Sequence, residues 1–121
     1  MTEEFSKMLR VFEKIGDVSE DVPLYKNGKP SKFVGSLKSS TGSKNINMGL
    51  LHYDWNRSIG VDKITQAMRL SEKAGFDGAF IVGKKFSRSA VEQAYRINET
   101  SDKRIFLMDT EEISTAFSKL P

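Results

Sequence analysis

The chain has 121 residues, of which 38% are hydrophobic and 29% are charged, with 19 Lys and Arg, 16 Asp and Glu, one His and no Cys. This length predicts a single domain over 1–121, because a chain of this size buries one core and not two of ordinary size. The lack of Cys excludes disulfides, thiolate zinc sites, iron–sulfur clusters and thiol nucleophiles, and a lone His argues against a multi-histidine metal centre.

The apolar segments are short and the charge is mildly basic. No apolar run approaches the roughly 20 residues of a membrane span, and the first residues lack the pattern of a signal peptide, so we expect a soluble intracellular protein with no membrane partner. The net charge of +3 permits nucleic-acid binding without requiring it. Residues 26–44 carry five Lys and no acidic residue, and a second basic cluster occupies 84–88. We expect these two stretches to form one basic face.

The amino-terminal quarter predicts a helix and then a connection. Apolar residues recur at steps of three and four over 4–15, which is the buried stripe of an amphipathic helix that ends at Gly16. Residues 17–27 predict a connection that holds a short extended piece at 22–25. The Asn27-Gly28 dipeptide within this region predicts a loop or a hairpin tip.

The middle of the chain predicts two antiparallel strands and a helix. The stretches 32–38 and 46–55 predict strands, antiparallel because only a short loop at 39–43 joins them. Residues 56–60 break the second strand. An amphipathic helix is then predicted over 62–74.

The last third predicts strands that alternate with helices. Gly75 ends the preceding helix, and the apolar run 78–82 is typical of a strand covered on both faces. The spacing of Ser89 and Glu92 predicts a capping box for a helix that reaches Asn98. A strand at 104–108 and a last helix, capped by Asp109 or Thr110, complete the chain. Parallel strands joined by helices predict an α/β fold of three layers, α/β/α, around a mixed sheet.

This order of elements resembles the restriction-endonuclease-like, or PD-(D/E)XK, nucleases, and the local sequence is similar to the catalytic domain of their Mrr-type branch. No single motif is specific, and the order and spacing carry the resemblance over most of the chain outside 17–43. The matching segments are Phe12-Glu13-Lys14-Ile15-Gly16, Arg57-Ser58-Ile59-Gly60-Val61, the run from Gly75 to Val82, Phe86-Ser87, and Ile105-Phe106-Leu107-Met108-Asp109.

The resemblance implies a metal-dependent site in the first hairpin, and its motif is degenerate here. In the family, an Asp on one strand and a Glu or Gln, one residue and then Lys on the next hold a divalent ion and position a water. The Asp position falls in the first strand around Lys32, the Glu or Gln position on Leu51 and the Lys position on Tyr53. Leu51 offers no oxygen and Tyr53 no ammonium. Because Mg²⁺ needs oxygen ligands, we expect neither a metal nor hydrolysis at these positions.

A shifted alignment leaves one catalytic alternative. Moving the motif by three residues makes Asp54-Trp55-Asn56 its counterpart, with Asp54 as a ligand of Mg²⁺ and Asn56 in place of the Lys. The favoured interpretation is that Asp54 is a solvated residue at the end of a strand, because the Lys is missing in both alignments.

Six basic residues are candidates for contact with nucleic-acid phosphates. Lys84, Lys85 and Arg88 follow a buried strand and open a helix, where free amides and the helix dipole add to their attraction for anions. Arg57 lies close to Trp55 and could combine charge with base stacking, although Trp55 is better interpreted as a core or interface aromatic. Lys38 and Lys44 belong to the basic hairpin, which either follows DNA or is a solvated edge. The candidates are Lys38, Lys44, Arg57, Lys84, Lys85 and Arg88.

These observations favour a catalytically inactive nuclease-fold domain that binds DNA or another nucleic acid through a basic face. One alternative is a protein-interaction scaffold within a larger nucleic-acid-processing or transcription complex, because fold does not determine function. Another is an active endonuclease with its site at Asp54, the one case that requires Mg²⁺. A protein partner and a homodimer both stay open.

Overall fold

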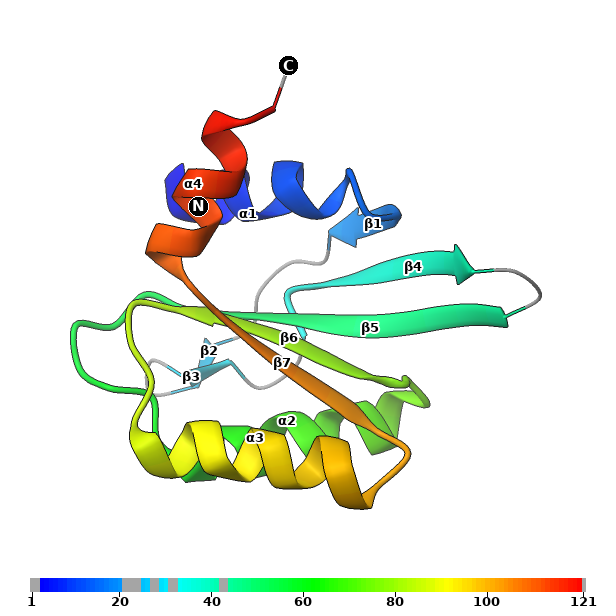
Figure 1. Cartoon of the computed structure of the whole chain (residues 1–121), viewed down its shortest axis with the longest axis vertical. Coiled ribbons are helices and arrows are strands. Elements are labelled where there is room, and N and C mark those ends of the chain that lie inside the picture. Colours follow the sequence, from blue (N-terminus) through cyan, green and yellow to red (C-terminus); the bar gives the residue numbers. More distant parts are fainter. Residues whose placement is uncertain (1–2, 21–24, 27–28, 31–32, 42–43, 121) are drawn as a thin grey trace.

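A mixed five-stranded sheet lies between two pairs of helices in the computed structural model, which describes residues 3–20, 25–26, 29–30, 33–41 and 44–120 (Figure 1). Its elements are α1 Glu3–Phe12, β1 Asp17–Glu20, β2 Tyr25–Lys26, β3 Lys29–Pro30, β4 Gly35–Thr41, β5 Lys44–Tyr53, α2 Val61–Ala74, β6 Gly78–Gly83, α3 Arg88–Thr100, β7 Arg104–Asp109 and α4 Thr110–Ser118. Helices α1 and α4 cover one face of the sheet and α2 and α3 the other. The predicted three-layer α/β/α class is confirmed.

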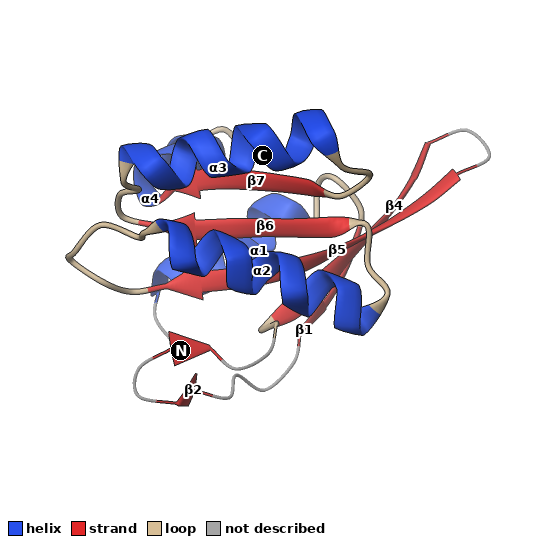
Figure 2. Ribbon diagram, turned by 90° about the horizontal axis from the view of Figure 1, so that it is seen from below, coloured by secondary structure: helices blue, strands red, loops and turns tan. Residues whose placement is uncertain are grey.

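The strand order is β1-β4-β5-β6-β7. The pairs β1–β4 and β4–β5 are antiparallel, whereas β5–β6 and β6–β7 are parallel and are joined through α2 and α3. Figure 2 shows β5, β6 and β7 running the same way behind these two helices. The predicted hairpin and the parallel strands after it are therefore confirmed. No helix in the described part of the chain is long and apolar enough to span a membrane.

Two apolar cores form because neighbouring strand residues point to opposite faces of the sheet. Leu51 packs with Ile64 and Ile81 on the side of α2 and α3. Leu50, one residue earlier, packs with Phe12 on the side of α1 and α4. Strand β6, between β5 and β7, is buried at five of its six residues, which confirms that its apolar run is covered on both faces.

Glycine is required at two places for different reasons, close packing at Gly49 and a left-handed backbone at Gly75. A Cβ atom added at Gly49 would lie 2.3 Å from Cε2 of Phe33, so the Phe33 ring rests directly on the backbone of β5. Gly75 ends α2 in the left-handed conformation, with φ of 72°, as predicted. A side chain at position 49 would collide with Phe33, and a side chain at position 75 would strain the backbone.

The predicted connection over 17–27 is wrong at its start, because Asp17–Glu20 form the edge strand β1. This strand pairs with Gly35–Lys38 of β4, so distant backbone groups stabilise it and no local apolar pattern is needed. Residues 22–24 lie outside the described residues. The hairpin tip at 27–28 also lies outside them, although Tyr25–Lys26 and Lys29–Pro30 on either side pair as antiparallel strands.

The predicted loop over 39–43 is too long, because β4 continues to Thr41 and β5 begins at Lys44, its partner in the ladder. Small polar residues near the end of a hairpin are typical of loops, so the sequence pattern predicts a loop here. In the structure, pairing between β4 and β5 keeps these residues extended. Residues 42–43 are outside the described part.

The helix start predicted at Ser89 is also wrong. Ser87 is the N-cap of α3, and its hydroxyl accepts a hydrogen bond of 3.1 Å from the backbone N–H of Ala90. Glu92 instead forms an ion pair with Arg88 one turn earlier. The predicted cap at Asp109 is confirmed, and with Glu112 it forms the reciprocal capping box of α4.

The outer edge of β7 is partly closed by a side chain of α3. The amide of Asn98 accepts a hydrogen bond of 2.7 Å from the backbone N–H of Ile105 and donates one of 3.0 Å to the carbonyl oxygen of the same residue. Asn98 thus makes the two bonds that a further strand would make. This arrangement protects an exposed sheet edge from pairing with another chain.

Candidate nucleic-acid interface

The basic candidates from the second half of the chain lie where parallel strands end. Loop 54–60 follows β5 and loop 84–87 follows β6, and the carboxyl ends of parallel strands share one end of a sheet. The two loops are tied together by a β-bridge between Ile59 and Phe86. Its bonds run from the N–H of Ile59 to the carbonyl of Lys85 and from the N–H of Ser87 to the carbonyl of Ile59, each 3.0 Å long.

A buried anchor fixes this pair of loops against the sheet. Ile59 is 1% exposed. A Cβ atom added at Gly83 would lie only 2.1 Å from the Cδ1 atom of Ile59. Gly83 at the end of β6 therefore makes room for Ile59. The side chains carried by the two loops consequently project from a frame set by backbone bonds and core packing.

Lys84 links the two loops through polar contacts. Its Nζ donates a hydrogen bond of 2.9 Å to Oδ1 of Asn56 and lies 3.7 Å from Oδ1 of Asp54. Both charged side chains are well exposed, at 37% for Lys84 and 48% for Asp54, so this ion pair contributes little to stability. Its effect on the site is to compensate part of the Lys84 charge.

Arg57 and Trp55 form a stacked pair beside these contacts. The guanidinium carbon of Arg57 lies 4.1 Å from the centroid of the Trp55 ring, within the range of a cation–π interaction. Trp55 is partly buried, packs against the core and meets the ring of Tyr53 edge-on at 4.9 Å. The structure thus agrees with Trp55 as a core aromatic, and Arg57 remains exposed above it.

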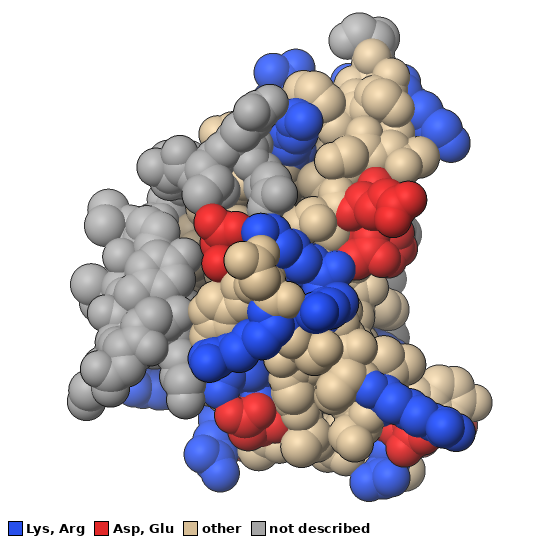
Figure 3. All heavy atoms as spheres, turned by 90° about the vertical axis from the view of Figure 1, so that its left-hand side faces the viewer, with Lys and Arg blue, Asp and Glu red and all other residues tan. Residues whose placement is uncertain are grey.

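Four cations gather at this end of the molecule: Arg57, Lys84, Lys85 and Arg88. We call this group the basic end. Lys85 is exposed, and Arg88 is 93% exposed while it pairs with Glu92 at 3.1 Å. Figure 3 views the corresponding side of the molecule and shows Lys and Arg side chains across its middle, with acidic side chains above and below them. The start of α3 at Arg88 adds the positive end of a helix dipole.

Lys38 and Lys44 do not join this group, so the expectation of one basic face is wrong for them. Lys38 pairs with Asn47 near the start of β5, whereas the basic end follows the last residue of that strand, Tyr53. Six residues of β-strand separate these points by about 20 Å. Lys44 opens β5 still farther away, and its side chain lies outside the described residues. The long hairpin carries these lysines to the opposite end of the sheet (Figure 1).

The positions of the family's catalytic residues lie in or near the apolar core. Leu51 is 0% and Tyr53 1% exposed, and both belong to the core under α2 and α3. Lys32 lies outside the described residues. Among the residues that are described, no group of three or more His, Cys, Asp or Glu side chains could hold a metal ion. Asp54 is a single carboxylate paired with an ammonium group, so these residues do not fit a Mg²⁺ ion.

Each member of the basic end is a candidate predicted from the sequence, but the contacts that organise these residues were not predicted. Asn56 entered only as the residue that replaces a catalytic Lys, whereas in the structure it accepts a hydrogen bond from Lys84, which lies 28 residues later. No local pattern marks such a partner, because the contact exists only once β5 and β6 lie side by side.

The architecture is that of a restriction-endonuclease-like domain. The solved structure of the "DNA modification-dependent restriction endonuclease AspBHI" matches this chain with a TM-score of 0.52 and 14% sequence identity, over 96% of this chain and 35% of that one. At this identity the likeness shows the fold alone, and it confirms the predicted restriction-endonuclease-like fold. This chain spans about a third of the length of that nuclease. No protein family and no curated protein matched the sequence.

Proposed function

We propose that this chain is a nuclease-fold domain that binds DNA or another nucleic acid through the basic end and does not cleave it. The observation that carries the proposal is that Arg57, Lys84 and Lys85 lie on two loops joined by backbone hydrogen bonds, with Arg88 beside them at the start of α3. Because the backbone that carries these cations is already held in place, only their side chains lose freedom when they meet phosphates, which favours binding by a small surface. The Mrr-type assignment is part of this proposal and rests on the sequence pattern alone.

The predicted loss of catalysis is supported by the environment of the motif positions. A hydrolytic site of this family needs carboxylate oxygens around a divalent ion and a nearby ammonium group. Leu51 supplies neither, and Tyr53 is enclosed by the core. Burial also denies substrate access to both positions. Hydrolysis at this hairpin would therefore require both new ligands and a rearranged core.

The charges at the basic end set the expected salt dependence. Each neutralised phosphate contributes about −0.9 to the slope of log affinity against log salt concentration for duplex DNA. Two of the four cations share their charge with Asp54 and Glu92. We therefore expect a slope between about −2 and −4.

The decisive experiment measures fluorescence anisotropy of labelled duplex and single-stranded DNA and RNA over a range of salt concentrations. The test variant is Arg57→Glu with Lys85→Glu, and the matched control is Arg69→Glu with Lys73→Glu on the exposed face of α2. Each substitution replaces a positive charge with a negative one and so lowers the net charge by two, and both double variants therefore change it from +3 to −1.

We expect the test variant to lose at least tenfold in affinity and to show a slope shallower by about 2, because two phosphate contacts disappear. The control should lose much less. Equal losses in both variants would mean that only net charge matters. An affinity that changes neither with salt nor with either pair of substitutions would reject the proposal, as would the absence of binding. Both results would favour the protein-interaction scaffold.

A further inference from the structure

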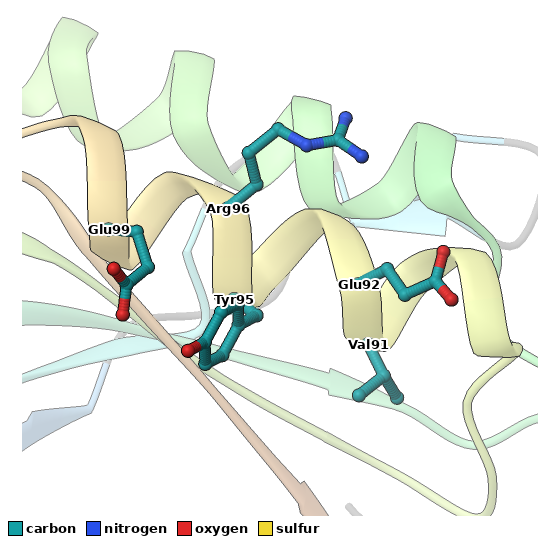
Figure 4. Close-up of a pocket in the computed structure, with 5 residues that line it drawn as sticks. All are labelled: Val91, Glu92, Tyr95, Arg96 and Glu99. Carbon is teal, nitrogen blue, oxygen red and sulfur yellow. The ribbon is translucent and has the colours of Figure 1, made fainter.

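The outer face of α3 carries two large apolar side chains outside the core. Val91 is 52% and Tyr95 67% exposed. They are four residues apart and so lie on the same side of the helix, as Figure 4 shows. With Glu92, Arg96 and Glu99 they line a shallow hollow on the surface. Exposed apolar side chains with a charged rim are typical of protein-interaction surfaces.

The charged residues on this face alternate in sign along the helix. Arg88, Glu92, Arg96 and Glu99 read positive, negative, positive, negative from the start of α3 to its end. A second copy of α3 placed antiparallel presents the same charges in reverse order, so each charge lies opposite one of the other sign. Parallel alignment would instead place like charges together. A pattern of this kind complements itself about a two-fold axis.

We propose that a second copy of this chain packs its α3 antiparallel against this face. The two-fold axis crosses the exposed face of α3 at the level of positions 93 and 94. Arg88 then faces the partner's Glu99, Glu92 faces the partner's Arg96, and Val91 faces the partner's Tyr95. The apolar pairs occupy the middle of the contact, where burial removes them from water. The ion pairs lie at its rim and set direction and register.

The neighbouring edge strand is blocked in part against self-association. The edge of β7 beside α3 has both backbone groups of Ile105 bonded to the side chain of Asn98. The amide of Asp109 at the other end of this strand donates to the carboxylate of Glu112. At Ile105 and at the amide of Asp109, a second copy therefore finds backbone groups that are already bonded. A single helix face of about 20 Å is small, so we expect a dissociation constant in the micromolar range.

The test is sedimentation velocity over a series of protein concentrations without nucleic acid. Glu92→Arg places two positive charges opposite each other, and Arg96→Glu places two negative charges together. Each variant alone should associate at least tenfold more weakly than the native protein. An equimolar mixture of the two should associate again, because every contact then joins opposite charges. The double variant should also recover association, and Arg69→Glu on α2 is the control.

Circular dichroism verifies that each variant is folded. A native protein that stays monomeric up to about 0.5 mM would overturn the proposal, since weak surface contacts are populated at such concentrations. A mixture that remains monomeric, or a Glu92→Arg variant that associates like the native protein, would also overturn it. The dimer contact and the basic end share Arg88, which pairs with Glu92. Because sedimentation is measured without nucleic acid, its result stays separate from the test of nucleic-acid binding.

Discussion

Replacing Asn98 tests whether a single side chain stabilises the edge of the sheet. Asn98→Ala removes both hydrogen bonds to the backbone of Ile105, whose lengths are 2.7 and 3.0 Å. A net contribution of about 1 kcal/mol for each bond, plus the penalty of leaving partly buried backbone groups unpaired, predicts a loss of about 2–3 kcal/mol. This is a large share of the 5–15 kcal/mol typical of folded domains.

Asn98→Asp separates the two bonds. A carboxylate still accepts the hydrogen bond from the N–H of Ile105 but cannot donate to its carbonyl, and it places negative charge beside that oxygen. We expect Asn98→Asp to destabilise the protein by at least 1 kcal/mol, since the lost bond is replaced by repulsion.

Urea unfolding followed by far-ultraviolet circular dichroism measures these differences, with Ser89→Ala on the exposed side of the same helix as the control. Light scattering at increasing protein concentration reports whether the opened strand edge promotes aggregation, which we expect for Asn98→Ala. The stabilising role of Asn98 is refuted if the free energy of unfolding of Asn98→Ala lies within 0.5 kcal/mol of the native value, or if Asn98→Asp is as stable as the native chain.

Three further predictions follow from local geometry. Gly49→Ala forces a methyl group against the ring of Phe33, 2.3 Å from its nearest atom, and should lower the free energy of unfolding by about 1–3 kcal/mol in the same urea titration. Ser87→Ala removes the cap of α3 and should lower it by about 1 kcal/mol, whereas Ser87→Asp should retain most of the stability. Plasmid incubated with the protein and Mg²⁺ or Mn²⁺ should remain intact on agarose gels. Cleavage abolished by Asp54→Ala would instead establish the endonuclease alternative.

Local signals determined much of the second half of the fold. The 3.6-residue periodicity of α2, the glycine that ends it and the apolar run of β6 all act within one element, so the sequence predicts them without knowledge of the rest. The capping box of α4 is equally local, because Asp109 and Glu112 are only three residues apart. The start of α3 shows the limit of such signals, since Ser87 and Ser89 both resemble caps and the packing of the preceding loop selects Ser87.

Sequence alone also singled out Arg57, Lys84, Lys85 and Arg88 as candidate contacts for phosphate, and it identified Leu51 and Tyr53 as unable to hold a metal. Tertiary structure decided which basic residues meet. Parallel pairing of β5 and β6 brings the two loops of the basic end together, whereas the long antiparallel hairpin takes Lys38 to the other end of the sheet. The edge strand β1 and the contact between Asn56 and Lys84 likewise depend on partners far along the chain, because hydrogen bonds between distant segments form only after the sheet is assembled.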